Sequence, residues 1–198
     1  MNDIDALRQE LSEYSIRSFN RRMVNGTGGN LSVRVPGTDT VLITPTGISL
    51  GDVKPEENIL VNLDGEILDS PMGLKGSKET SFHLGAYKLR PDVGAISHVH
   101  PLYATAYSNL GKDLPMVTVS SRGGLGHVPC VDSFPAGSKE LREVVCEGIQ
   151  AHPGVKVLLM KEHGILAMGT DLVNAFYLAD LLEDTAKIAY LAAQIQKK

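Results

Sequence analysis

Two histidines separated by a single residue are the clearest candidates for chemistry in this chain. His98 and His100 end a short apolar run, Val93 to Val99, that predicts a β-strand. Side chains two positions apart in a strand point to the same face, about 7 Å apart at the backbone. Two neutral imidazoles placed in this way can bind one divalent metal ion through bonds of about 2.0–2.1 Å.

A third histidine occupies a similar position after another predicted strand. His163 follows the apolar run Val155 to Met160 and precedes Gly164, and Glu79 offers a carboxylate elsewhere in the chain. Three imidazoles would hold a metal ion and leave positions open for a substrate, as catalytic metal sites require. The alternative is that the first two histidines are exposed polar residues or a hydrogen-bonded pair. Spacing alone does not decide between these hypotheses.

Glu79 is predicted to lie at the start of a helix that runs to about Arg90 and is stopped by Pro91. The spacing of four residues places Glu79 and His83 on one face of that helix. Glu79 is either an ordinary first-turn carboxylate, favoured by the helix dipole, or a base that faces the metal ion. For His83 we expect a buried position or one behind the metal ligands.

Two loops combine glycine with hydroxyl or amide side chains. The first covers residues 25–30, before a predicted strand at 31–35, and the second is Pro45-Thr46-Gly47, after a predicted strand at 41–44. Backbone N–H groups in such loops can point at an anion. The alternative for the first loop is a plain glycine-rich turn.

The remaining elements alternate irregularly along the chain, which indicates an α/β fold with a mixed sheet between helices. Asp64-Gly65 predicts a hairpin turn, and Ser138 predicts a helix N-cap. Residues 120–126 read as a polar, glycine-rich connection. Strands are expected at 59–63, 66–68 and 116–119, and helices at 3–23, 102–110, 137–149 and 171–194.

Composition indicates an ordinary globular protein. The chain of 198 residues predicts one domain spanning residues 1–198, and its net charge of −4 argues against nonspecific binding to nucleic acid. Two cysteines in a chain of this length favour a protein with reduced thiols in the cytoplasm. We expect neither a signal peptide nor a membrane span, because no apolar run approaches 18 residues.

Five motifs together resemble the class II sugar-phosphate aldolase family, in the same order and over nearly the whole chain. The family includes L-fuculose-1-phosphate aldolase, L-ribulose-5-phosphate 4-epimerase and the adducin head domain. The motifs are GTGGNLS at 26–32, ITPTG at 43–47, GSKE at 76–79, HVH at 98–100 and EHG at 162–164.

The resemblance implies a role for each matching residue. The family's three zinc ligands match His98, His100 and His163, and the acidic residue that ligates zinc and then acts as base matches Glu79. Zn²⁺ is the implied cofactor, although this ligand set also suits Mn²⁺ or Co²⁺. The residues that match the phosphate-binding loops are Thr27, Gly29, Asn30, Thr46, Gly47 and Ser77, and Lys78 is expected to meet phosphate or a substrate carboxylate.

The resemblance also implies a fold and an assembly. The expected fold is a three-layer α/β/α arrangement around a mixed, mostly antiparallel sheet. The expected assembly is a homotetramer with each site at a subunit boundary, acting on a small sugar phosphate.

The reaction implied is the reversible cleavage of a ketose 1-phosphate to dihydroxyacetone phosphate and an aldehyde. A divalent metal acting as Lewis acid would stabilise the enediolate, and a carboxylate whose pKa is raised by partial burial would move the proton on carbon. The alternatives are a decarboxylase of the 3-oxo-tetronate 4-phosphate type, an epimerase or a dehydratase that uses the same metal site. A non-catalytic scaffold like the adducin head is a third hypothesis, disfavoured by the presence of all three histidines.

Two departures from the family pattern keep the alternatives open. Lys78 stands where the family most often has serine. Relatives that resemble the decarboxylases also have lysine at this position. The tyrosine that protonates the aldehyde oxygen in the fuculose enzyme is not found near Thr118 and Val119. The proton donor is therefore unassigned, with Tyr103, Tyr107 and Tyr190 as candidates in principle.

Overall fold

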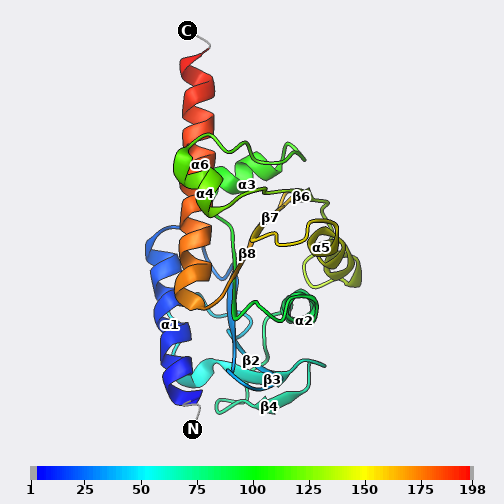
Figure 1. The fold of residues 1–198 in the computed structure, drawn as a ribbon. Coiled ribbons are helices and arrows are strands. Elements are labelled where there is room, and N and C mark those ends of the chain that lie inside the picture. Colours follow the sequence, from blue (N-terminus) through cyan, green and yellow to red (C-terminus); the bar gives the residue numbers. More distant parts are fainter. Residues whose placement is uncertain (1–3, 197–198) are drawn as a thin grey trace.

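The computed structural model describes residues 4–196 and contains one mixed sheet of eight strands, in the order β4-β3-β2-β1-β5-β8-β7-β6 (Figure 1). All neighbouring strands are antiparallel except β6 and β7, which are parallel. The strands are β1 (Asn30–Arg34), β2 (Thr40–Ile43), β3 (Ile59–Asn62), β4 (Ile67–Asp69), β5 (Ala95–Val99), β6 (Cys130–Val131), β7 (Val157–Met160) and β8 (Gly164–Gly169).

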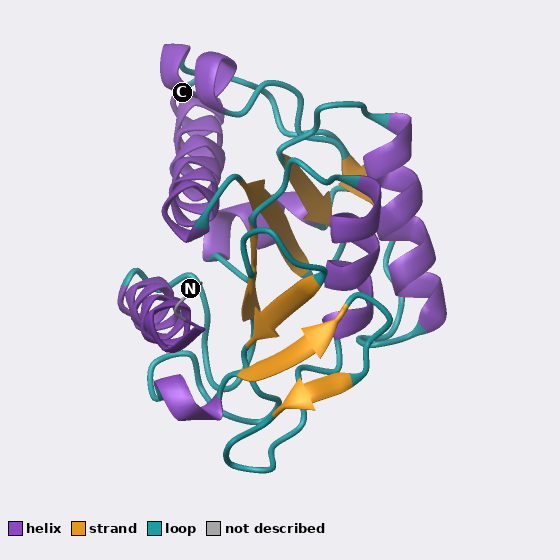
Figure 2. Cartoon of the chain, turned by 60° about the horizontal axis from the view of Figure 1, so that its bottom comes forward, coloured by secondary structure: helices purple, strands orange, loops and turns teal. Residues whose placement is uncertain are grey.

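Helices cover both faces of this sheet (Figure 2). One apolar cluster packs α1 and α6 against one face, and a second packs α2 and α5 against the other. The helices are α1 (Ile4–Asn20), α2 (Thr80–Leu89), α3 (Leu102–Ser108), α4 (Val119–Gly124), α5 (Lys139–Ala151) and α6 (Leu172–Ile195), with a short 3₁₀ helix at Pro55–Glu57. The predicted three-layer α/β/α fold with a mostly antiparallel sheet is confirmed.

Local signals place several of these elements as the sequence predicts. The Ser138 side chain accepts a hydrogen bond from the Leu141 backbone N–H at 3.1 Å and caps α5. β3 and β4 form the hairpin predicted around Asp64-Gly65. Of the predicted helix at 3–23, Asp3 lies outside the described residues and the helix ends at Asn20. Among the described helices, none combines the length and the apolar character needed to cross a membrane.

The prediction for residues 116–126 is wrong. The expected strand at Met116 to Val119 is irregular up to Thr118. Helix α4 starts at Val119, the last residue of that expected strand, and continues into the expected polar connection at 120–126. The Thr118 hydroxyl accepts a hydrogen bond from the Ser121 backbone N–H at 3.0 Å. The β-branched residues Thr118 and Val119 therefore form the cap and the first residue of a helix instead of a strand. Two further strands were not predicted: β6, which has only two residues, and β8, which begins directly after His163.

The central strands bring side chains of the sequence motifs to one edge of the sheet. Asn30 at the start of β1 pairs with His98 of β5, and His98 pairs on its other side with Leu166 of β8. His163 lies in the turn between β7 and β8. The ends of three neighbouring strands therefore place two histidines and an asparagine together.

Candidate metal centre and phosphate loops

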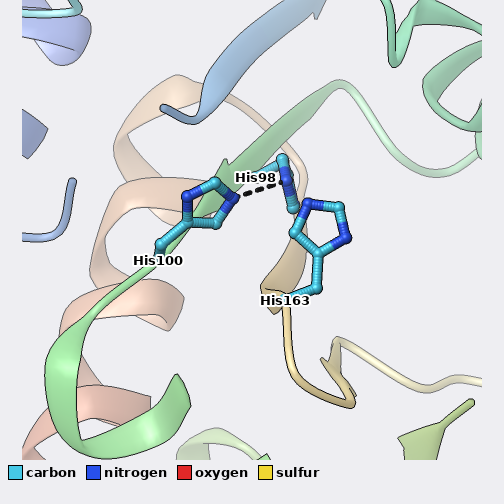
Figure 3. A group of neighbouring side chains, drawn as sticks. All are labelled: His98, His100 and His163. Atoms are coloured by element: carbon cyan, nitrogen blue, oxygen red, sulfur yellow. Dashed lines mark hydrogen bonds between the residues drawn. The ribbon is translucent and has the colours of Figure 1, made fainter. Parts of the chain in front are cut away.

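Three histidines converge at this end of the sheet (Figure 3). One ring nitrogen from each of His98, His100 and His163 lies within 4.8 Å of the other two. His98 is fully buried, whereas His100 and His163 are partly exposed. The structure thus brings together the three histidines that the sequence analysis selected.

The orientation of His98 is set by the backbone of the neighbouring strand. Its Nδ1 lies 2.9 Å from the Ile165 carbonyl oxygen, which can only accept, so Nδ1 carries the proton. The Nε2 atom faces the site and lies 3.0 Å from the Nε2 of His100. A backbone carbonyl that holds the other ring nitrogen is typical of a histidine that ligates a metal.

Two glycines make room for the His100 ring. A Cβ atom built on Gly28 would lie 2.9 Å from the His100 Nδ1, and one built on Gly164 would overlap both the His100 ring and the Val99 carbonyl oxygen. The His100 backbone N–H donates to the Met23 carbonyl at 2.8 Å. Gly28 of the GTGGNLS motif and Gly164 of the EHG motif therefore have a steric reason to be glycine.

Glu79 faces the histidines from the first position before α2. It is the N-cap residue, but its side chain makes no capping hydrogen bond and instead points into the site, where it is 6% exposed. Its Oε2 accepts a hydrogen bond from the Asn30 Nδ2 at 2.9 Å and lies 3.1 Å from the His98 Nε2. Its Oε1 lies 3.1 Å from the His163 Nε2 and has no hydrogen-bond partner among the described residues.

The pKa of Glu79 is lowered, which contradicts the prediction of a raised pKa. Burial alone would raise the pKa of this carboxyl, but the facing imidazoles of His98 and His163 and the Asn30 amide outweigh burial and lower it. Glu79 is therefore held as a carboxylate. The sequence analysis could count its burial but not the three groups that face it.

A chain of buried hydrogen bonds supports Glu79 from behind. Because Asn30 uses its amide nitrogen for Glu79, its Oδ1 accepts from the His83 Nε2–H at 2.6 Å. The His83 Nδ1 then accepts from the Ser32 hydroxyl at 2.7 Å, and the Ser32 oxygen accepts from the Tyr87 hydroxyl at 2.9 Å. Burial above all, with the nearby His98, lowers the pKa of His83 to about 3, so this imidazole is neutral.

The expected buried position of His83 is thus confirmed, whereas the hydrogen-bonded Ser32 and Tyr87 were missed. A signal for Tyr87 was present, since it follows His83 by four residues on the same helix face. Ser32 is a buried polar residue between Leu31 and Val33 in β1. Neither signal indicates the site unless it is known that β1 and α2 lie next to each other in the fold.

The donor set fits a divalent metal ion. Three imidazole nitrogens and one carboxylate converge, and the buried Glu79 Oε1 lacks a hydrogen-bond partner among the described residues. A cation between these atoms would satisfy Oε1 and separate the two facing Nε2 atoms. His98, His100, His163 and Glu79 are therefore the residues that could hold it.

The phosphate-loop residues line the same cavity as the metal ligands. The cavity has a volume of about 320 Å³. It is lined by Thr27, Gly28, Gly29, Asn30, Pro45, Thr46, Gly47, Ser77, Lys78, Glu79, His100, Ala136 and His163, while the buried His98 lies beneath it. All seven residues that the resemblance assigned to phosphate are present, and Gly28, Pro45 and Ala136 are additions.

Part of the loop backbone is already used by the protein. The Thr46 N–H donates to the Lys75 carbonyl at 3.0 Å, and the Gly28 N–H donates to the Asn25 carbonyl at 3.0 Å. The Gly28 and Thr46 amides are therefore not available to an anion. Side-chain hydroxyls and the exposed Lys78 ammonium are left as donors at the cavity rim.

The three tyrosines considered as proton donors lie outside the cavity lining. Tyr103 of α3 and Tyr190 of α6 pack together with ring centroids 5.9 Å apart. Thr118 caps α4, and Val119 is exposed. Among the described residues, no tyrosine of this chain lines the site.

Comparison with known proteins agrees with the geometry. Residues 9–190 match the family model described as "Class II Aldolase and Adducin N-terminal domain". The L-fuculose phosphate aldolase of Methanococcus maripaludis is 35% identical over 173 residues, with 87% of this chain and 90% of that protein covered.

Two further relatives extend the comparison. The 5-methylthioribulose-1-phosphate/5-deoxyribulose-1-phosphate aldolase of Escherichia coli is 36% identical, with 87% of this chain and 78% of that protein covered. A solved structure of an L-fuculose 1-phosphate aldolase is 31% identical with a TM-score of 0.87, and the match covers 95% of this chain and 86% of that one. The chain therefore belongs to the class II aldolase family and is a lyase of that family.

Proposed function

We propose that this protein catalyses the reversible, metal-dependent cleavage of a ketose 1-phosphate to dihydroxyacetone phosphate and an aldehyde. The observation that carries the proposal is the shared cavity. The phosphate-loop residues and the metal ligands His100, His163 and Glu79 line one space of about 320 Å³. A phosphate held by the loops would place the ketone of a small sugar phosphate beside the histidines.

The phosphate gives orientation and remote binding energy. Thr27, Thr46, Ser77 and Lys78 are among the residues that line the cavity, and they carry three hydroxyls and one ammonium. Binding energy realised on the phosphate can offset the cost of placing the reacting carbons correctly. These residues therefore determine which end of the sugar reaches the metal ligands.

A divalent metal ion at His98, His100 and His163, when bound, supplies Lewis acidity that stabilises negative charge on the ketone oxygen. In the synthesis direction, Glu79 accepts a proton from the hydroxymethyl carbon of dihydroxyacetone phosphate. The electron pair left on that carbon forms the new bond to the aldehyde carbon, and the aldehyde oxygen takes up a proton. Cleavage runs these steps in reverse. Glu79 meets the first requirement of a base because it is held ionised.

We propose Zn²⁺ as the resident metal, with Mn²⁺ or Co²⁺ as substitutes, and a cytoplasmic homotetramer as the working form. Support for the assembly comes from large apolar side chains that are exposed on the C-terminal end of α6 and on the nearby helices α3 and α4. Val119 of α4 is 79% exposed, and Ile195 of α6 is 74% exposed. The set that we call the α6 patch is Leu102, Val119, Tyr190, Leu191 and Ile195. Monomeric soluble proteins rarely expose large contiguous apolar patches.

A decarboxylase that uses the same metal site is the second candidate. Two observations favour it. Lys78 lines the cavity, where its ammonium could hold a substrate carboxylate, and no tyrosine within residues 4–196 lines it. An aldolase with the site at a subunit boundary would instead draw the proton donor from a neighbouring copy.

A product assay separates the two candidates. Metal-loaded protein is given L-fuculose 1-phosphate, 5-deoxyribulose 1-phosphate or a 3-oxo-tetronate 4-phosphate, and dihydroxyacetone phosphate and carbon dioxide are measured. We expect dihydroxyacetone phosphate from at least one of the ketose phosphates and no carbon dioxide from the acid. Because loss of carbon dioxide from a 3-oxo-tetronate 4-phosphate also leaves dihydroxyacetone phosphate, the aldolase is scored only on the two ketose phosphates. Carbon dioxide from the acid, with no dihydroxyacetone phosphate from either ketose phosphate, would replace the aldolase with the decarboxylase.

A further inference from the structure

Helix α6 contacts the first turn of α3, which follows the proposed metal ligand His100 closely in sequence. Three residues of α6, spaced at i, i+4 and i+7, meet the first turn of α3. The Glu183 carboxylate accepts hydrogen bonds from the Tyr103 N–H at 3.0 Å and the Ala104 N–H at 2.8 Å. Lys187 Nζ lies 5.5 Å from the Tyr103 ring centroid, and the Tyr190 ring packs on Tyr103. Figure 1 shows α3 lying against α6.

The Glu183 hydrogen bonds take the place of an N-cap, because α3 has no capping side chain of its own. Its N-cap residue is Pro101, which offers no side-chain hydrogen bond. The N–H groups of a first helical turn have no partner within the helix, and burying them unpaired is costly. Ala104 is fully buried. Glu183 therefore supplies, with both carboxylate oxygens, the cap that α3 lacks.

Only Pro101 separates this capped turn from His100. On one side, His100 is tied by its N–H to the Met23 carbonyl, and its ring is closed in by Gly28 and Gly164. On the other side, its backbone continues through a proline with restricted φ into the turn that Glu183 holds. A shift of that turn would move His100 against neighbours that leave it little room.

We propose that Glu183 is a positioning residue for His100, acting through the start of α3 without touching the metal site. The inference rests on the metal-binding part of the proposed function and not on the reaction that follows. Outer groups that orient metal ligands typically change metal affinity by about 10–100-fold when they are removed.

The test is direct titration of chelator-treated protein with Co²⁺, followed by visible absorption. For Glu183→Ala we expect at least about 10-fold weaker Co²⁺ binding and an altered d–d spectrum. Glu183→Gln keeps one acceptor oxygen, so its Co²⁺ affinity should lie between that of Glu183→Ala and that of the unaltered protein. Asp184→Asn is the matched control, since Asp184 is the exposed neighbour on the same helix, and it should leave affinity and spectrum unchanged.

A thermal melt of each metal-free variant separates positioning from ordinary capping. A lower melting temperature together with unaltered Co²⁺ affinity and spectrum would overturn the proposal and leave Glu183 as a cap only. If Glu183→Ala does not fold, Glu183→Gln and Tyr190→Leu carry the same comparison. Because Co²⁺ binding does not depend on a sugar substrate, failure of the proposed aldol reaction would not imitate either result.

Discussion

At the scale of the single residue, Glu79 is the base that we propose, and its surroundings support that role. A buried carboxylate between two imidazoles is kept ionised, while its unpaired oxygen faces the place where a cation fits. The same residue can therefore ligate a metal and accept a proton from carbon. Its position before α2, not within it, turns the side chain inward.

Replacing Glu79 with Gln should remove the base and keep the shape. We expect turnover to fall by about 10²–10⁴-fold, the range typical of a lost general base, while the protein still folds and binds metal through its histidines. Steady-state kinetics and metal analysis on the same sample measure both quantities. Glu147→Gln, a substitution at an exposed position, is the control. Undiminished turnover in Glu79→Gln would remove this residue from the mechanism.

Gly164 is the second residue whose identity the site requires. Gly164→Ala places a methyl group against the His100 ring and the Val99 carbonyl, so we expect a loss of about 1–3 kcal/mol in the free energy of unfolding and weaker metal binding. Gly123→Ala is a matched control, because a Cβ there meets nothing within 4 Å. Equal stability of the two variants in urea unfolding would show that His100 is not confined as described.

At the scale of the element, helix α2 positions Glu79 at its N-terminus and supports it through a chain of buried hydrogen bonds. His83 and Tyr87 follow Glu79 at successive turns and connect through Ser32 of β1 and Asn30 to the carboxylate. The neutral His83 has a consequence for acid stability. Its pKa is about 3 in the folded protein, against an ordinary value of 6.5.

Because the folded pKa is lowered, His83 contributes stability that is present above pH 6.5 and is lost as the pH falls towards 3. The loss is at most about 1.4 kcal/mol per pH unit for one group. We expect His83→Gln to reduce the fall in unfolding free energy between pH 6.5 and 4.5 by about 2–3 kcal/mol. Urea unfolding of metal-free protein at both pH values measures this, and an equal pH dependence in the two proteins would contradict it.

Elements with strong local signals could be predicted from the sequence, and those set by distant contacts could not. The apolar run that ends in His98, the helix stopped by Pro91 and the Ser138 cap all depend on neighbours in sequence. By contrast, the inward turn of Glu79 depends on Asn30, 49 residues away. Thr118 and Val119 look like strand residues, yet the Thr118 cap commits them to α4.

At the scale of the whole molecule, the α6 patch lies on the same helix as Glu183. We expect Val119→Asp and Ile195→Asp to shift a homo-oligomer toward smaller species in sedimentation velocity, because each places a charge on an apolar contact. Ile67→Asp is the control, since Ile67 is also exposed but lies on edge strand β4, far from the patch (Figure 1). A stable monomer for the unaltered protein would remove both the tetramer and a shared site.

The central claim is that this cavity performs the aldolase half-reaction, and proton exchange tests it most directly. Metal-loaded protein is incubated with dihydroxyacetone phosphate in D₂O without any aldehyde, and proton NMR follows the hydroxymethyl hydrogens. We predict that one of these hydrogens is replaced by deuterium, and that the exchange stops with a chelator and in Glu79→Gln. Absence of exchange in fully metal-loaded protein would contradict the account.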